Sequence, residues 1–323
     1  MKLGILGAGK IVQEFLPLVE EIDGLEAHSL YSTIRSLDKN TELAESYGLR
    51  HVFTDIDELL TDDEIDTVYV ALPNHLHYDF VKKALEADKH VICEKPFTLR
   101  KDHLNELADL AEQKHLILVE AITTIDLPNF KVIKEKLADI GPVRLINCNF
   151  VQYSSRYDAF LEGEIAPVFN PEMGGGALVD LNVYNIHFVL ALLGKPEKVQ
   201  YLSNMSRGVD TSGLLTLSYE NTQVNAVGSK DSHGLKQILI QGEKGVIIIE
   251  DGTNSLDHAK IIIDGQSELI DFNQNKHRMI PEFEAFVEII DNIDLEEAHK
   301  RMAHSKMVMD VLETSIIDGK LNI

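Results

Sequence analysis

The pattern of apolar and polar positions changes once along the chain. Up to residue 121, short apolar runs alternate with stretches in which apolar residues recur every three or four positions. The predicted strands are Lys2–Leu6, Leu25–Tyr31, Thr67–Ala71, His90–Cys93 and Leu116–Glu120, and the predicted helices are Ile11–Ile22, Lys39–Tyr47, His77–Glu86 and Asp102–Lys114. Repeated strand–helix–strand units are typical of a parallel sheet with helices on both faces.

After Pro142, strands follow one another more directly. The predicted strands are Val143–Gln152, Lys198–Met205, Leu214–Tyr219, Val224–Gly228, Gln237–Gln241 and Gly245–Glu250, and the predicted helices are Gly176–Leu193, Ile280–Asn292 and Leu295–Ile317. Glu220-Asn221 and Gly242-Glu243-Lys244 are typical of hairpin turns. We therefore predict an α/β protein with a doubly wound parallel sheet at residues 1–121. Residues 122–323 should form an α+β domain with a large, mostly antiparallel open sheet.

The amino-acid composition indicates which kinds of binding partner this protein can have. A chain of 323 residues with 44% apolar residues can form two cores. Its 53 acidic and 30 basic side chains give a net charge of −23, which repels nucleic acid and anionic membranes. The two cysteines cannot form a disulfide framework. The N-terminus lacks an export-signal run, and we recognise no stretch of about 20 apolar residues. These features predict a cytoplasmic protein.

A glycine loop follows the first predicted strand. In Gly7-Ala8-Gly9-Lys10-Ile11-Val12, the first glycine permits a tight turn and the second lets the backbone approach a pyrophosphate. Val12 replaces the third glycine of the usual pattern, at a position that serves helix–strand packing. Any strand-to-helix turn can contain Gly-x-Gly. Its place at the start of a strand–helix–strand unit favours a dinucleotide site at Gly7, Ala8, Gly9, Lys10 and Ile11.

The end of the second predicted strand bears on the choice of dinucleotide. An acidic residue there would bind the ribose diol of NAD. Instead the strand ends in Tyr31-Ser32-Thr33, and Arg35 follows. A hydroxyl and a guanidinium suit the 2′-phosphate of NADP. We therefore predict Ser32 and Arg35 as cofactor contacts and favour NADP over NAD, with a solvated loop charge as the alternative for Arg35.

Three further segments point to one family. Ala71-Leu72-Pro73-Asn74-His75-Leu76-His77 and Cys93-Glu94-Lys95-Pro96 each follow a predicted strand, at the sheet edge where doubly wound folds bind ligands. The third segment runs from Gly174-Gly175-Gly176 through Asp180 to Tyr184. Together they resemble the Rossmann-fold oxidoreductase family of glucose–fructose oxidoreductase, inositol dehydrogenase and dihydrodiol dehydrogenase (Gfo/Idh/MocA), over the whole chain. Glu94-Lys95-Pro96 is the most specific mark.

The resemblance implies an NAD(P)-dependent oxidoreductase that transfers a hydride between the cofactor and a CH–OH or C=O group of a sugar, polyol or diol. It implies a catalytic set of Lys95, Tyr184 and Asp180. Around the reactive end of the cofactor it implies Leu72, Pro73, Asn74, His77 and Glu94. Free lysine and tyrosine have pKa values near ~10, so a base at neutral pH needs a shifted pKa. Lys95 and Tyr184 can exchange roles, because coupled groups titrate as a pair.

The helix after the glycine run carries the weaker predictions. Asp180, Tyr184 and His187 are spaced by four and three residues, so they share a helix face. Inositol-dehydrogenase-like members carry His where this chain has Tyr184, so we expect the tyrosine-containing branch and no inositol-type site. His187, Arg156 and Tyr157 are further substrate candidates, with core packing or a solvated loop as alternatives. The stretch around Ile125 lacks an arginine that related chains often have.

Several other interpretations stay open. His77 could cap a helix, Tyr184 could be a core aromatic and Asp180 a helix-face acid. His75 and His77 have no cysteine or acid at ligand spacing, so we predict no metal site. Alternative functions are a cofactor-binding sensor without turnover and an NAD-dependent glycosidase on the same fold. The family suggests a homodimer or homotetramer that associates through the open sheet.

Overall fold

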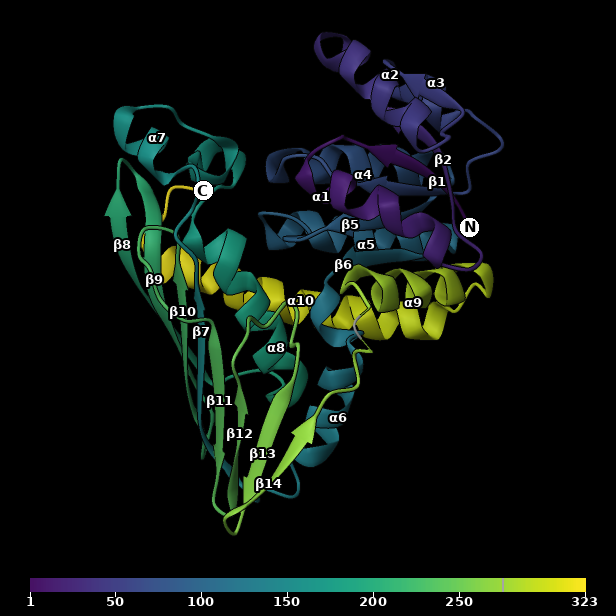
Figure 1. Cartoon of the computed structure of the whole chain (residues 1–323). Coiled ribbons are helices and arrows are strands. Elements are labelled where there is room, and N and C mark those ends of the chain that lie inside the picture. The colour runs from purple at the N-terminus through teal and green to yellow at the C-terminus, as the bar shows by residue number, and fades with distance from the viewer. Residues whose placement is uncertain (275) are drawn as a thin grey trace. The chain divides into compact units, whose positions relative to one another are not determined.

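The computed structural model describes residues 1–274 and 276–323, and the packing divides them into two units (Figure 1). The first unit consists of Met1–Ala121 and Met279–Lys306. The second consists of Ile122–Arg278 and Met307–Ile323. The sequence pattern assigned all of 122–323 to one domain, whereas the packing groups 279–306 with the N-terminal residues.

The sheet of the first unit is parallel throughout. Its strands are β1 (Lys2–Leu6), β2 (Glu26–Tyr31), β3 (His51–Phe53), β4 (Thr67–Val70), β5 (His90–Glu94) and β6 (Leu118–Ala121). Their order is β3-β2-β1-β4-β5-β6, which confirms the doubly wound prediction. The order reverses at β1, and such a switch point leaves a crevice at the carboxyl ends of the strands. The pattern does not indicate β3, because three residues are too few to show an alternation.

Helices cover both faces of this sheet. They are α1 (Lys10–Phe15), α2 (Leu37–Ser46), α3 (Ile56–Leu60), α4 (His77–Glu86), α5 (Lys101–Lys114), α9 (Met279–Asp291) and the first part of α10 (Leu295–Asp318). On one face, Phe15 of α1 lies 4.2 Å from Phe283 of α9 and 5.4 Å from Tyr69 of β4, between ring centroids. On the other face, α4 packs against β4 and β5. Burial on both faces explains why these strands are almost entirely apolar.

The second unit contains a large sheet of mostly antiparallel strands. They are β7 (Val143–Val151), β8 (Lys198–Ser206), β9 (Val209–Ser218), β10 (Gln223–Ser229), β11 (Gln237–Gly242), β12 (Gly245–Ile249), β13 (Ala259–Ile263) and β14 (Gln266–Ile270). Their order is β14-β13-β12-β11-β7-β10-β9-β8, with β7 and β10 parallel and every other pair antiparallel. This confirms the predicted architecture and both hairpins. The pattern does not indicate β14, most of whose residues are polar and exposed.

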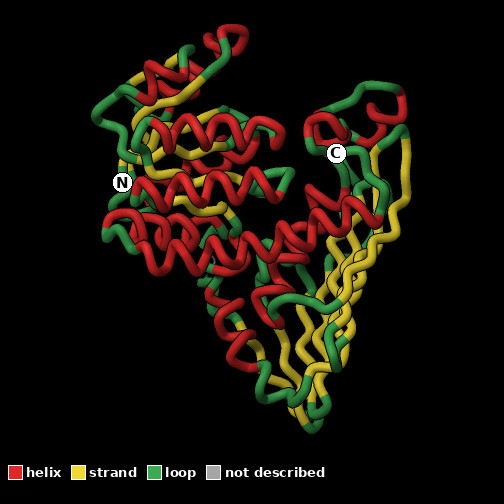
Figure 2. The backbone as a smooth tube through the Cα atoms, turned by 180° about the vertical axis from the view of Figure 1, so that it is seen from behind, coloured by secondary structure: helices red, strands yellow, loops and turns green. Residues whose placement is uncertain are grey.

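Helices gather on one face of the second sheet, as Figures 1 and 2 both show for α6 (Pro128–Lys136) and α8 (Val183–Leu193). A short helix, α7 (Tyr157–Glu162), precedes the glycine run, and a π-helical turn at Leu178–Asn182 leads into α8. The helical stretch Pro171–Leu193 is long and apolar enough to cross a membrane, which the sequence pattern did not indicate. Because 67% of its apolar window is buried, we interpret it as a core helix.

Candidate functional site

The glycine loop after β1 depends on both of its glycines. Gly7 has a φ of +102°, and an added Cβ there would lie 2.6 Å from the carbonyl oxygen of Ala71. Gly9 precedes α1 with an ordinary φ of −69°, and an added Cβ would meet no atom within 4 Å. Val12 is fully buried in the core. Only glycine therefore fits at position 7, while Gly9 leaves open space in front of the loop.

A cavity of about 260 Å³ lies in front of this loop. It is lined by Gly7, Ala8, Gly9, Tyr31, Ser32, Thr33, Ser36, Lys39, Asn40 and Leu72. The Ser32 hydroxyl donates to the Thr33 carbonyl at 3.0 Å and accepts from the Asn40 amide at 2.9 Å. No carboxylate lines the cavity within the described chain, and Lys39 supplies its one cationic side chain.

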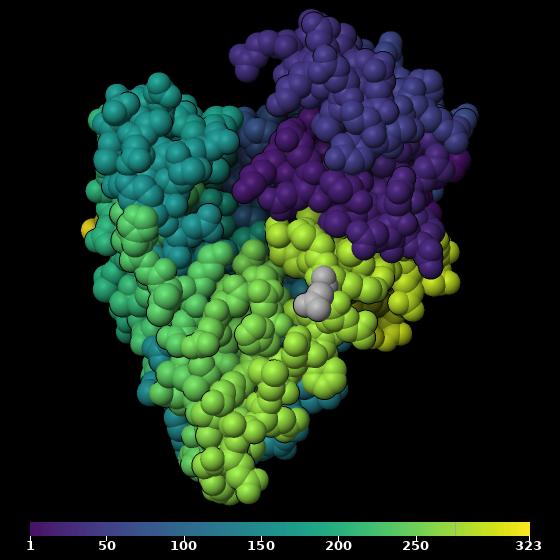
Figure 3. Space-filling model, in the orientation of Figure 1, coloured from purple at the N-terminus to yellow at the C-terminus, as the bar shows by residue number. Residues whose placement is uncertain are grey.

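Arg35, the basic residue predicted to contact the cofactor, lies outside the lining of this cavity. Its side chain is exposed, and it does not line the cavity. Residues 34–36 form a tight 3-10 turn, and α2 then begins at Leu37, so Lys39 on its first turn reaches the cavity instead. This segment forms part of the violet-blue outer surface of the first unit in Figure 3. Lys39 is therefore a further basic residue, beside the predicted Arg35, that could contact a cofactor in this cavity.

His77 connects the loops that follow β4 and β5. It is fully buried, with Nδ1 2.9 Å from the Pro96 carbonyl oxygen and Nε2 2.8 Å from the Leu72 carbonyl oxygen. Either tautomer of the ring donates a hydrogen bond to one of these oxygens. Burial lowers the pKa of His77, although the carbonyl oxygens oppose this effect. The side chain has no exposed surface and holds two loops together, and the contact of His77 with the cofactor stays a prediction.

The loop that carries Lys95 is anchored by two carboxylates. Glu94 accepts a hydrogen bond from the Tyr69 hydroxyl at 2.7 Å. Glu120, at the end of β6, is 5% exposed and accepts from the Phe97 backbone N–H at 2.9 Å and from the Ser305 hydroxyl at 2.6 Å. Lys95 itself is half-buried. The backbone on both sides of Lys95 is therefore held by hydrogen bonds within the first unit.

Asp180 and Tyr184 belong to the second unit, and both are half-buried. Asp180 lies in the π-helical turn, and its Oδ2 accepts a hydrogen bond from Lys230 Nζ at 2.7 Å. The Tyr184 ring lies 5.7 Å from the Phe150 ring of β7, between centroids. Turns of this kind occur often at functional sites. The partner shown for Asp180 is therefore Lys230, which the sequence pattern did not indicate.

Three further residues, His187, Tyr157 and Arg156, were predicted as substrate contacts. His187 is fully buried, so its side chain has no exposed surface that a substrate could contact. The Tyr157 ring packs against Phe160 and Phe169 in a small aromatic cluster. Arg156 is exposed at the start of α7. These surroundings match the packing and solvated-loop alternatives better than a substrate contact.

Asp210 holds the glycine run that precedes the π-helical turn. Its Oδ2 accepts from the Leu178 backbone N–H and from the Tyr201 hydroxyl, both at 2.7 Å. Gly176 has a φ of +133°, and an added Cβ would collide with Asp210 Oδ1. Burial raises the pKa of Asp210 to about 6, although hydrogen bonds from Tyr201 and Leu178 oppose this. This carboxylate therefore anchors the start of the segment that carries Asp180 and Tyr184.

Asp210→Asn should change the pH dependence of stability. The folded pKa lies above the ordinary 3.8, so the stability from this carboxyl is complete below about pH 4 and is lost as the pH rises through 6. Between pH 4 and 7 the free energy of unfolding of the variant, relative to wild type, should rise by about 3 kcal/mol. Urea unfolding across this range measures the difference, and a constant difference would contradict the assignment.

Sequence reasoning missed four residues that shape these two areas: Lys39, Glu120, Asp210 and Lys230. Glu120 left a usable signal, since it is a charged residue at the end of an otherwise apolar predicted strand. Lys230 and Asp210 each adjoin a strand end, but many surface charges do so. Their importance comes from burial, at 2% and 1% exposure, and burial is a property of the tertiary structure.

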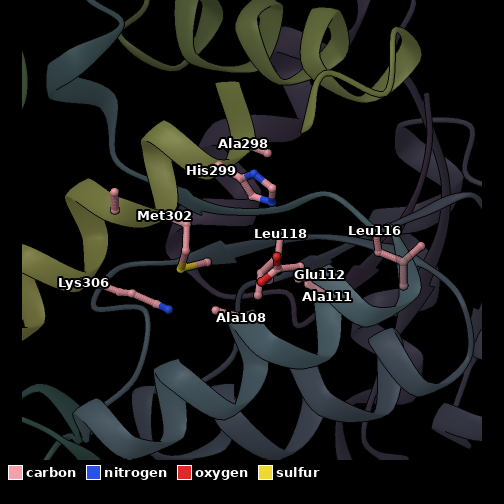
Figure 4. A pocket seen from close by; sticks show the side chains of 10 residues that line it. Ala108, Ala111, Glu112, Leu116, Leu118, Ala298, His299, Met302 and Lys306 are labelled. Carbon is pink, nitrogen blue, oxygen red and sulfur yellow. The ribbon is translucent and has the colours of Figure 1, made fainter. Parts of the chain in front are cut away.

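A second cavity in the first unit lies apart from the predicted residues. It measures about 180 Å³ and is bounded by α5, β6 and α10, with Glu112, His299 and Lys306 among mostly apolar side chains (Figure 4). None of the predicted site residues lines it. In the described ranges 1–274 and 276–323, no group of three or more His, Cys, Asp or Glu side chains is arranged to hold a metal ion.

The sequence of this chain is similar to known protein families and to named relatives. Residues 1–121 match a family model described as "Oxidoreductase family, NAD-binding Rossmann fold", and residues 130–248 match the "GFO/IDH/MocA C-terminal domain". The chain is 34% identical to scyllo-inositol 2-dehydrogenase (NADP(+)) of Bacillus subtilis, over 97% of this chain and 95% of that protein. It is 28% identical to trans-1,2-dihydrobenzene-1,2-diol dehydrogenase of Xenopus tropicalis, over 84% and 81%.

The fold also matches solved structures. A 3-ketoreductase from Actinomadura kijaniata, in complex with NADP and TDP-benzene, superposes with a TM-score of 0.87. The alignment covers 98% of this chain and 97% of that chain at 21% identity. At this level of identity the likeness supports the shared fold alone.

Proposed function

Since this chain belongs to the GFO/IDH/MocA family of NAD-binding oxidoreductases, we propose that it transfers a hydride between a nicotinamide cofactor and a CH–OH or C=O group of a sugar, polyol or diol. One observation carries this proposal. The glycine loop and the Lys95 loop lie at the carboxyl edge of one sheet, and buried hydrogen bonds of His77 and Glu120 hold the connecting segments.

The first unit fits a nicotinamide dinucleotide. Gly9 leaves open the space that a pyrophosphate needs, and the cavity beyond it is lined by hydroxyls, an amide and Lys39. The cofactor supplies the hydride chemistry when bound. The residues we assign to its binding are Gly7, Ala8, Gly9, Lys10, Ile11, Ser32, Lys39, Leu72, Pro73, Asn74 and Glu94. Cofactor binding belongs to residues 1–121 in this proposal, and substrate binding to the second unit.

The proton is managed by Lys95, Tyr184 and Asp180. When an alcohol is oxidised, a group on the protein must accept the hydroxyl proton, and the same group returns it when a carbonyl is reduced. We assign this exchange to Tyr184, with Lys95 polarising the substrate oxygen and favouring the phenolate. A tyrosine with its ordinary pKa near ~10 is a poor base at neutral pH, so this role requires that the pKa of Tyr184 be lowered. Asp180 binds a substrate hydroxyl.

The substrate class follows from the named relatives. They are dehydrogenases of scyllo-inositol and of a dihydrobenzenediol. The inositol relative keeps cyclic polyols in the class, against the expectation drawn from Tyr184. Incubation with NADP, NAD and a panel of inositols, aldoses and diols, followed by nicotinamide absorbance, tests the function. Complete absence of turnover would favour the cofactor-binding sensor, and hydrolysis of glycosides the NAD-dependent glycosidase. Neither alternative is favoured by these relatives.

Lys39 should decide the choice between NADP and NAD. We propose that its ammonium pairs with the 2′-phosphate, the role that the sequence pattern gave to Arg35. Lys39→Ala should then weaken NADP binding ~10- to 100-fold and leave NAD binding within ~3-fold, because only NADP carries that phosphate. Arg35→Ala is the matched control and should change neither. Titration of cofactor fluorescence measures both affinities. Equal losses for the two cofactors, or a selective loss in Arg35→Ala, would contradict this assignment.

The second sheet has a face through which copies of the chain could associate. On the helix-free face of the second sheet, Leu202, Leu214 and Val227 lie side by side on β8, β9 and β10, and Leu202 is 68% exposed. An apolar row that is exposed at Leu202 and half-buried at Leu214 and Val227 suits a second copy of the chain. We propose that the chain forms a homodimer or homotetramer through this face and works in the cytoplasm.

A further inference from the structure

Lys230 is a buried lysine in the second unit, on the loop that follows β10. Its side chain is 3% exposed, and Nζ donates to Asp180 Oδ2 and to the Val168 carbonyl oxygen, both at 2.7 Å. The same Nζ lies 4.7 Å from the centroid of the Phe169 ring. An ammonium group with these partners is held in one position by an anion, a carbonyl dipole and an aromatic face.

The backbone of Lys230 is held equally firmly. Its N–H donates to the Thr211 carbonyl at 2.8 Å, and its carbonyl accepts from the Ser154 N–H at 2.9 Å. The carboxylate of the neighbouring Asp231 accepts hydrogen bonds from the hydroxyls of Thr211, Ser212 and Ser229. The backbone and the side chain of Lys230 together direct its ammonium group at Asp180.

The strand before Lys230 also fixes the helical turn of Asp180. Asn182 donates to the Ala226 carbonyl of β10 at 3.0 Å. Gly228 lets this turn approach closely, since an added Cβ would lie 3.1 Å from the Ala177 carbonyl oxygen. One short segment, residues 226–230, therefore holds the backbone of the turn through Asn182 and its carboxylate through Lys230.

We infer that Lys230 is a positioning residue that keeps the Asp180 carboxylate ionised and in one orientation, so that it can accept a hydrogen bond from a hydroxyl of the sugar or polyol substrate. This inference rests on the proposed function for the role of Asp180. A half-buried carboxylate without a cation would be protonated more readily and would rotate more freely. Lys230 acts on substrate binding through Asp180 and does not touch the reacting atoms.

Lys230→Met removes the charge and keeps much of the chain length. The KM for the polyol substrate should rise ~10- to 100-fold, with a smaller change in kcat and a cofactor dissociation constant within ~2-fold of wild type. The acid limb of the kcat/KM profile should move up by about one pH unit or more, because Asp180 then gains a proton more easily. Lys230→Arg, which keeps the charge, should recover most of the affinity.

Three further variants separate this role from mere packing. Lys195→Met breaks an exposed Lys–Asp pair with Asp310 in the same unit and should leave all parameters unchanged. Asp210 also feels the charge of Lys230, so Asp210→Asn tests whether the moved pH limb belongs to Asp210. The double variant Lys230→Met, Asp180→Asn should be no worse than Asp180→Asn alone, since Lys230 acts through that carboxylate.

A measurement without turnover keeps the inference independent of the proposed function. In the cofactor-free protein, the carboxyl ¹³C signal of Asp180, identified by its loss in Asp180→Asn, should titrate at higher pH in Lys230→Met than in wild type. An unchanged titration, or additive losses in the double variant, would overturn the inference even where the enzyme is active. A shifted titration with no substrate turned over would support the pairing and count against the proposed function alone.

Discussion

Lys95→Met and Tyr184→Phe should each lower kcat at least ~100-fold while the protein still folds and binds its cofactor. Without the ammonium group the substrate oxygen loses its polarising charge, and without the phenol no group exchanges the hydroxyl proton. Met keeps the chain length of Lys95, and the buried partners of its loop, His77, Glu94 and Glu120, are untouched. Steady-state kinetics with a substrate from the panel and cofactor titration give the two numbers.

Matched variants make this test specific. Lys82→Met removes a lysine that pairs with Glu106 on the surface, and Tyr47→Phe removes a phenol that is 42% exposed. Both should retain wild-type kinetics. Near-normal turnover in Lys95→Met and Tyr184→Phe together would end the assignment of the proton chemistry to these two residues. A loss confined to Tyr184→Phe would show that the polarising charge of Lys95 is dispensable, and a loss confined to Lys95→Met would contradict proton exchange by Tyr184.

Gly7→Ala and Gly9→Ala should separate folding from cofactor binding. At position 7 the added methyl group meets the Ala71 carbonyl oxygen at 2.6 Å, and the backbone has a φ of +102°. We expect this variant to lose about 2–4 kcal/mol of stability and to bind cofactor poorly. At position 9 the methyl group meets nothing within 4 Å, so stability should stay within about 1 kcal/mol of wild type.

Gly7→Ala mainly changes the stability of the protein, whereas Gly9→Ala mainly changes its affinity for the cofactor. Gly9→Ala should still raise the cofactor dissociation constant ~10-fold or more, because its methyl group takes up space that the pyrophosphate needs. Urea unfolding and cofactor titration of the same preparations measure both effects. Wild-type cofactor affinity in Gly9→Ala would show that this loop does not hold the phosphates.

The pattern of apolar and polar positions predicts some helices and strands accurately and misses others. It predicts β1 and α4 with the bounds that the structure has, because each is a run with one clear period and a plain stop signal. It predicts one helix at Ile11–Ile22, whereas the structure changes to a 3-10 turn at Leu16. Pro17 has no N–H for the α-helical bond, which accounts for the change. The helices α3, α6 and α7 are short, and the pattern does not indicate them.

Some residues of the candidate site are also indicated by local sequence motifs, and others are not. Gly7, Gly9, Glu94 and Lys95 could be selected from the chain, because a turn that needs glycine and a motif after a strand are local features. The pattern points to Arg35, whereas a 3-10 turn before α2 brings Lys39, and not Arg35, to the cavity lining. A local pattern indicates that a basic residue is near, but the path of the backbone decides which one.

By itself, the sequence determined the two kinds of sheet, the glycine loop and the family, because period, turn chemistry and motif spacing are written along the chain. Only the tertiary structure decided that Glu120 anchors the Lys95 loop, that His77 is buried between two loops and that Lys230 pairs with Asp180. The pairs Glu120–Phe97, His77–Pro96 and Lys230–Asp180 are separated by 23, 19 and 50 residues. Their energies arise from burial, which no local pattern carries.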